Sequence, residues 1–157
     1  MNKRRIDILI VGNYQVGKSS YIQDLNPIDN SNPPTIKVDT TIGEVFVRLH
    51  KCISNIPVDA AIIIYDATNE YSFICHEKWY KMIKDIYGDI SIILVANKCD
   101  LDHKSFYTGQ INELIKMYGL GVYNISSKES HMTMFPIRSS IRRVFNDWNI
   151  DIIDFRG

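Results

Sequence analysis

Short apolar blocks alternate along the chain with longer stretches in which apolar residues recur every three or four positions. The blocks are rich in β-branched residues and apolar on both faces, which is typical of strands buried in a parallel sheet. They span residues 6–11, 35–38, 60–65, 90–96 and, more weakly, 122–125. The longer stretches predict helices over residues 73–87, 111–118 and 137–148. This alternation predicts an α/β fold with a mainly parallel sheet of about five strands flanked by helices.

One polar stretch interrupts this pattern. Residues 26–34, with the sequence NPIDNSNPP, hold three prolines and three asparagines and are expected to form a loop. The sequence contains no internal repeat and no second set of strands and helices. Residues 1–157 are therefore predicted to form a single domain.

The charge balance and the cysteines restrict the kinds of partner. The chain has 18 Lys and Arg residues and 18 Asp and Glu residues, so their charges cancel. The net charge therefore does not indicate binding to nucleic acid or to a membrane surface, and an anionic ligand has to be held by local groups. Cys52, Cys75 and Cys99 match neither a zinc site nor a disulfide framework and are expected to be free thiols. With no long apolar segment and no lipidation signal, a cytoplasmic protein without a membrane anchor is expected.

A phosphate-binding loop is encoded directly after the first strand. The residues GNYQVGKS at 12–19 fit the pattern G-x-x-x-x-G-K-[ST] between a predicted strand and a predicted helix, which is the context that this motif requires. Backbone N–H groups of such a loop surround a phosphate, Lys18 is expected to bridge the terminal phosphates, and Ser19 is expected to ligate Mg²⁺. The expected phosphate-binding residues are Gly12, Asn13, Tyr14, Gln15, Val16, Gly17, Lys18, Ser19 and Ser20.

A second polar segment, NKCD at residues 97–100, follows a predicted strand and favours guanine as the base. The Asp100 carboxylate can accept hydrogen bonds from N1 and the exocyclic amino group of guanine, whereas adenine offers no such pair of donors. Asn97 is expected to brace the neighbouring loops, and the aliphatic part of Lys98 to lie on the base. The later segment SSK can offer backbone N–H groups to the guanine O6. The expected guanine-binding residues are Asn97, Lys98, Asp100, Ser126, Ser127 and Lys128.

These motifs, in this order, make the chain resemble the small GTPases of the Ras superfamily, in particular the Rab and Ran branches. The run AIIIYDATNEYSF at residues 61–73 and the later Trp79 also resemble the Rab pattern. The resemblance extends from Ile6 to about Trp148. It implies a P-loop NTPase fold and binding of GTP or GDP with Mg²⁺. Where the catalytic residues are complete, it also implies hydrolysis of GTP to GDP and phosphate.

The switch regions of the family align with this sequence in two ways. One places residues 40–47, TTIGEVFV, at switch I, with Thr41 as a Mg²⁺ ligand, and leaves no D-x-x-G motif. The other places residues 36–46, IKVDTTIGEVF, at the D-x-x-G region with one extra residue, and makes Asp39 the Mg²⁺-binding aspartate. The second alignment is preferred because the spacing from Asp39 to Asp66 then lies close to that of the family. It leaves almost no room for switch I, so the edge strand after the first helix is expected to be missing.

Several departures from the family affect catalysis. Glu44 replaces the water-positioning glutamine, the bulky Tyr14 stands where Ras proteins have glycine, and no arginine in the loop after Lys18 could act on the phosphate. Phosphoryl transfer to water needs an oriented nucleophile and stabilised charge. The prediction is therefore a protein that binds guanine nucleotide with slow or absent intrinsic GTP hydrolysis, and no catalytic residue is assigned.

Two other functions stay open. The chain could be a pseudo-GTPase, that is, an interaction module that does not switch with nucleotide. It could also be a P-loop kinase, although the sequence shows neither the arginine-bearing lid nor the acceptor pocket of such an enzyme. If the protein switches, residues 26–34 and 44–55 are expected to move, and a protein partner could bind there.

Overall fold

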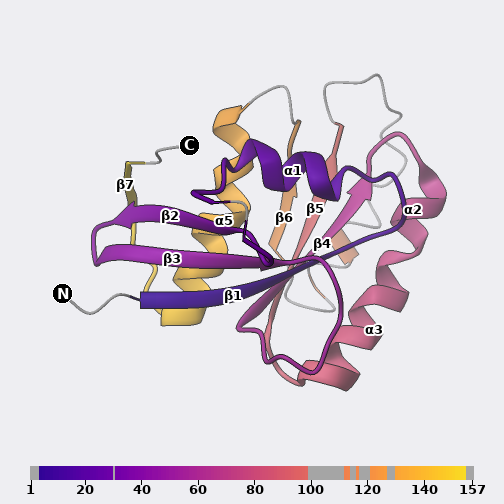
Figure 1. Ribbon diagram of the computed structural model, residues 1–157. Helices are drawn as coiled ribbons and strands as arrows, with labels where there is room; N and C mark the ends of the chain where they lie inside the picture. Colours follow the sequence, from indigo (N-terminus) through magenta and orange to yellow (C-terminus); the bar gives the residue numbers. More distant parts are fainter. Residues whose placement is uncertain are drawn as a thin grey trace.

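The computed structural model describes residues 4–29, 31–98, 112–113, 116, 121–126 and 130–154. Their strands form one seven-stranded sheet in the order β6-β5-β4-β1-β3-β2-β7 (Figure 1). The strands are β1 (Arg4–Val11), β2 (Thr35–Thr40), β3 (Gly43–His50), β4 (Ala60–Asp66), β5 (Ser91–Asn97), β6 (Gly121–Asn124) and β7 (Ile152–Asp154). The helices among these residues are α1 (Lys18–Asp24), α2 (Glu70–Ile74), α3 (His76–Tyr87) and α5 (Ser130–Phe145). None of the described helices is long and apolar enough to cross a bilayer.

The sheet is parallel from β6 to β3, whereas β2 and β7 run antiparallel to their neighbours. Every residue of β4 is buried, as expected for a strand covered on both faces. Side chains of the central strands enter two apolar clusters. One cluster includes Tyr21 of α1 and Ile137 of α5, and the other includes Phe73 of α2 and Ile83 of α3. The predicted α/β architecture with a mainly parallel sheet is confirmed, and the sheet has more strands than expected.

The strand that was expected to be missing after the first helix is present, and that prediction is wrong. β2 pairs along its whole length with β3. Residues 35–38 therefore form a strand as predicted, but they lie in the antiparallel part of the sheet. β3 is not among the predicted strands, although the partly exposed Glu44 and Arg48 alternate with the buried Val45, Val47 and Leu49. This alternation is typical of a strand that is not covered on both faces.

Two links between elements are short. Residues 25–34 connect α1 to β2, and residues 51–59 connect β3 to β4 with no helix or strand between them. Of residues 44–55, which were expected to move if the protein switches, residues 44–50 form β3, with Val47 fully buried. Only the last part of that segment lies in a loop.

Candidate phosphate and base site

The loop at residues 12–17 leaves the end of β1 and enters α1 through two tightly packed glycines. A Cβ at Gly12 would stand 2.2 Å from the carbonyl oxygen of Ile64 in β4. Gly17 has φ +96°, in the left-handed region, and a Cβ there would stand 2.4 Å from Asn97 Nδ2. A side chain at either position would displace its neighbour. The packing of the strands thus requires both fixed glycines of the motif.

Lys18 begins α1, and its side chain folds back over the loop. Its Nζ donates hydrogen bonds to the carbonyl oxygens of Gly12 at 2.6 Å and Asn13 at 2.8 Å. Burial lowers the pKa of Lys18, and the charge of Lys51 lowers this pKa further, against an opposite effect of Cys52. The ammonium group is thus held at the loop by two carbonyl oxygens.

Two side chains join the end of β5 to the loop. Asn97, which is 2% exposed, donates from Nδ2 to the carbonyl oxygen of Val16 at 2.9 Å. Lys98 donates from Nζ to the carbonyl oxygen of Gln15 at 3.0 Å and to Asp66 Oδ2 at 2.8 Å. This geometry agrees with the expected bracing role of Asn97. Its buried Oδ1 has no hydrogen-bond partner in the described part of the chain, so it could accept a hydrogen bond from a ligand.

The expected base site lies only partly within the described residues. Ser126 follows β6 and is buried. The backbone N–H of Ile125 donates to the carbonyl oxygen of Ala96 at 2.8 Å, which places Ser126 beside the end of β5. Asp100, Ser127 and Lys128 lie outside the described residues. The ends of β5 and β6 therefore meet at the edge of the sheet where open α/β folds bind ligands.

Three residues between the two glycines, which the motif leaves variable, differ in their environment. Tyr14 is 89% exposed, so its ring does not fill the loop. Gln15 has φ +64°, which is unusual for a residue other than glycine. Asn13 Oδ1 accepts a hydrogen bond from Trp79 Nε1 at 3.0 Å, which ties the loop to α3. The motif gives no sign of this last contact, although Trp79 contributes to the family resemblance. Of the remaining loop residues, Val16 is buried, and Ser20 is exposed on α1.

Neither residue expected to complete a Mg²⁺ site lies near Ser19. Asp39 pairs with Glu44 at the start of β3. The other end of β3 lies beside the phosphate loop, about 20 Å along the strand from Glu44. The Asp39 carboxylate lies 3.6 Å from the Lys37 ammonium. Thr41 lies in the turn between β2 and β3. The predictions of Asp39 and Thr41 as Mg²⁺ ligands are therefore wrong, because residues 35–40 form the antiparallel strand and not the parallel strand that leads to the phosphate site.

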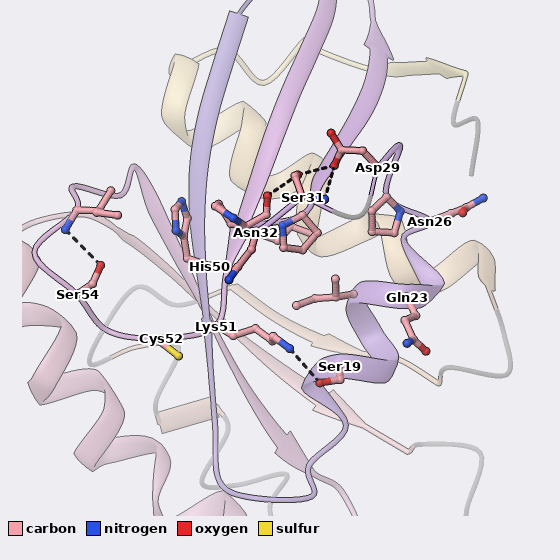
Figure 2. A pocket seen from close by; sticks show the side chains of 16 residues that line it. Ser19, Gln23, Asn26, Asp29, Ser31, Asn32, His50, Lys51, Cys52 and Ser54 are labelled. Carbon is pink, nitrogen blue, oxygen red and sulfur yellow. Dashed lines mark hydrogen bonds between the residues drawn. The ribbon is translucent and has the colours of Figure 1, made fainter.

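The residue that does follow the parallel strand is Lys51. Its Nζ donates a long hydrogen bond to Ser19 Oγ at 3.4 Å (Figure 2). In P-loop NTPases an aspartate assists the loop hydroxyl in holding Mg²⁺, whereas an ammonium group repels a divalent cation. Within the described residues, no group of three His, Cys, Asp or Glu side chains is placed to hold a metal ion. These side chains do not fit the Mg²⁺ arrangement of P-loop NTPases.

A cavity of about 890 Å³ opens beside Ser19 and Lys51. It lies between α1, the loop before β2 and the end of β3 (Figure 2). Asp29 is the one acidic residue among the described residues that line it. A second cavity of about 580 Å³ has Tyr14 and Trp79 in its lining. The phosphate loop is thus accessible from two sides.

Comparison with known proteins identifies the family of the chain. The profile of the Ras family matches residues 35–146. Human Ras-related protein Rab-3B and Caenorhabditis elegans Ras-related protein Rab-3 are each 28% identical to this chain, over 78% of the chain and 66% of their own length. The chain thus spans just under two thirds of the length of these relatives. Ras-family proteins in general bind guanine nucleotide and Mg²⁺. Because the family match covers more than half of the sequence, the chain belongs to the Ras family, as its motifs predict.

Proposed function

We propose that this protein binds guanine nucleotide at the loop of residues 12–20 and that it hydrolyses GTP slowly or not at all. The observation that carries the proposal is the bonding of Asn97 and Lys98 to the loop carbonyls of Val16 and Gln15. These bonds hold the start of the NKCD segment against the phosphate loop. A nucleotide could therefore contact both segments with little rearrangement, which lowers the entropic cost of binding.

The choice of guanine over adenine rests on residues predicted from the sequence. Asp100 would accept two hydrogen bonds from guanine, while Ser126, Ser127 and Lys128 would surround the O6. With adenine the carboxylate would lose its donors, at a cost of about 1–3 kcal/mol or more. The protein should accordingly bind GDP and discriminate against ADP.

Slow hydrolysis is supported by what the links around the site contain. Residues 51–59 hold neither a glutamine to orient water nor an arginine to stabilise charge. Glu44, which aligned with the family's glutamine in the preferred alignment, lies in β3 beside Lys37 and not at the loop. The argument from Glu44 to weak hydrolysis is therefore wrong, and the composition of the short link replaces it.

The test uses purified protein and labelled GTP in a single-turnover assay, with Rab-3B assayed in parallel. We expect GDP to raise the melting temperature of the protein and hydrolysis to be far slower than in the Rab-3B sample. Lys98→Met should weaken GDP binding about tenfold, because it removes a charged hydrogen bond to the loop. Lys84→Met on α3 is the matched control.

Each half of the proposal can fail separately. Hydrolysis at the rate of the Rab-3B sample would contradict slow turnover. If neither GDP nor GTP changed the melting temperature, nucleotide binding itself would be contradicted.

A second candidate is an interaction module that binds nucleotide without switching. The observation that favours it is the pair of short links at residues 25–34 and 51–59, with the intervening β3 fixed inside the sheet. Hydrogen exchange separates this function from that of a switch: equal protection of residues 51–59 in the GDP-bound and GTP-bound protein indicates a module that does not switch.

A further inference from the structure

Lys51 stands beside the hydroxyl of Ser19 because of the register of β3. β3 runs parallel to β1 with His50 opposite Leu9, so the next residue emerges at the edge of the sheet that carries the phosphate loop. There its Nζ lies 3.4 Å from Ser19 Oγ, and the side chain reaches toward the first turn of α1 (Figure 2). The pairing of β3 with β1 therefore fixes the backbone position of Lys51, and the contact with Ser19 Oγ shows where its ammonium group lies.

A second ammonium group, that of Lys18, belongs to the same loop, where its Nζ donates to the carbonyl oxygens of Gly12 and Asn13. The charge of Lys51 is one of the causes that lower the pKa of Lys18, which indicates electrostatic repulsion between the two ammonium groups. The one acid among the described residues lining the cavity, Asp29, accepts a hydrogen bond from the backbone of Ser31. Lys51, a cation in the lining of a cavity with a single described acid, favours an anionic ligand there.

Two further acids close to this part of the sheet, Asp7 and Asp59, already have partners, and Asp59 Oδ2 accepts a hydrogen bond from the Asp7 N–H. Asp7 of β1 accepts hydrogen bonds from Arg48 Nε at 2.7 Å and lies 2.7 Å from His50 Nε2. Its carboxylate is thus engaged within the sheet. The charge of Lys51 therefore remains available to a ligand of the loop.

We propose that the Lys51 ammonium supplies the positive charge that Mg²⁺ supplies in P-loop NTPases, so that the protein binds a nucleoside diphosphate or triphosphate in its metal-free form. This inference rests on the proposed nucleotide site. Lys18 and Lys51 together would offset part of the negative charge of the phosphates. The Ser19 hydroxyl would contact a lysine where the corresponding hydroxyl of P-loop NTPases contacts a metal ion. A monovalent ammonium also stabilises less developing charge than a divalent metal, in line with slow hydrolysis.

The test is the affinity for GDP, measured by calorimetry in excess Mg²⁺ and again in EDTA. For the wild-type protein we expect the two dissociation constants to agree within about threefold, or the one in EDTA to be the lower. Lys51→Gln should weaken binding in EDTA about tenfold, because a charged contact with phosphate is lost. Lys81→Gln, an exposed lysine of α3 that pairs with Glu77, is the matched control and should change neither value.

The charge-reversed variant gives an independent result. Lys51→Asp restores a carboxylate beside Ser19, and its GDP affinity should become at least about tenfold higher in Mg²⁺ than in EDTA. Because Lys51 is exposed, all variants should melt close to the wild-type temperature, and their far-UV circular dichroism confirms that they fold.

Several results would overturn the inference. A wild-type affinity that rises by more than about threefold with Mg²⁺ would show that a metal binds in spite of Lys51, while leaving the proposed function intact. Unchanged binding by Lys51→Gln in EDTA would show that the lysine does not serve the phosphates. Absence of GDP binding under both conditions would overturn the proposed function and this inference with it.

Discussion

Lys98 connects more parts of the site than any other single side chain described above. It joins the carbonyl of Gln15 in the loop to Asp66 at the end of β4, and itself lies directly after β5. Burial raises the pKa of Asp66, but hydrogen bonds from Lys98 and Thr68 outweigh this effect, so the pKa lies below its ordinary value. The carboxylate therefore stays charged and keeps Lys98 in place. The loop is held in shape by the protein's own side chains.

The first prediction at this scale concerns Gln15. Its φ of +64° is a conformation that costs a residue with a side chain about 1–2 kcal/mol, and Lys98 bonds to its backbone only. Gln15→Gly removes the steric cost but increases the entropy of the unfolded chain. We expect a net gain of about 0.5–1 kcal/mol in the free energy of unfolding, measured by urea denaturation.

The control for this prediction is a glycine substitution of the same residue type in a helix. Gln23→Gly in α1 should lower the free energy of unfolding by about 1 kcal/mol. A loss of stability in Gln15→Gly as large as in Gln23→Gly would mean that the side chain of Gln15 stabilises the loop by more than its backbone conformation costs.

At the scale of elements, β1 and β3 are joined by charged side chains as well as by their backbone. Asp7 of β1 contacts Arg48 and His50 of β3, and its N–H donates to Asp59 Oδ2 at 2.8 Å. Burial raises the pKa of Asp7, but the hydrogen bonds and charges of Arg48 and His50 outweigh this effect, so the pKa lies below its ordinary value. This network stabilises the strand pair that positions Lys51.

Its pH dependence follows from the sign of the shift. A carboxyl group whose pKa is lowered by folding stabilises the protein above its unfolded pKa, and this contribution is lost as the pH falls through the folded value. We expect the free energy of unfolding to fall between about pH 5 and about pH 3. Asp7→Asn should cost about 1–3 kcal/mol at neutral pH and should reduce this fall.

The comparison for Asp7 is Asp85→Asn, an exposed acid of α3. Urea denaturation across the pH range should show an almost unchanged profile for it. If the profiles of Asp7→Asn and the wild type were parallel down to pH 3, the network would contribute nothing that depends on the charge of Asp7.

How far the sequence predicts these elements depends on whether their signal is local. Residues 12–19 form a contiguous motif between a strand and a helix, and β4 is apolar on both faces, so both are found from the sequence. β3 alternates polar and apolar residues, and its place in the sheet is decided by pairing with the distant β1. The role of Lys51 depends on that register, because a shift of one residue would place a different side chain beside Ser19. For this reason the sequence led to Asp39, whereas the structure places Lys51 at the site.

At the scale of the whole molecule, backbone pairing joins the strands that carry the site, and the links around the site are short. β3 lies between β1 and β2, and residues 51–59 return directly to β4. A γ-phosphate thus has no long segment in residues 51–59 that it could order or release. This arrangement favours a protein whose surface changes little with the state of the nucleotide.

Hydrogen exchange provides the measurement. With GDP and with a non-hydrolysable GTP analogue, we expect equal protection of residues 51–59, and ligand-dependent protection at residues 12–20 in both states. Rab-3B, treated in the same way, is the positive control for a switching protein. A difference between the two nucleotides at residues 51–59 as large as in the switch segments of that control would contradict a non-switching module.

The short strand β7 has a consequence for association between copies of the chain. β7 pairs with β2 only at Asp39 and Thr40. Within the described part of the protein, residues 35–38 of β2 therefore have no strand on the side that faces away from β3. An open edge of this kind can template aggregation. Lys37 lies within that stretch, so a second strand approaching it would have to desolvate a charge.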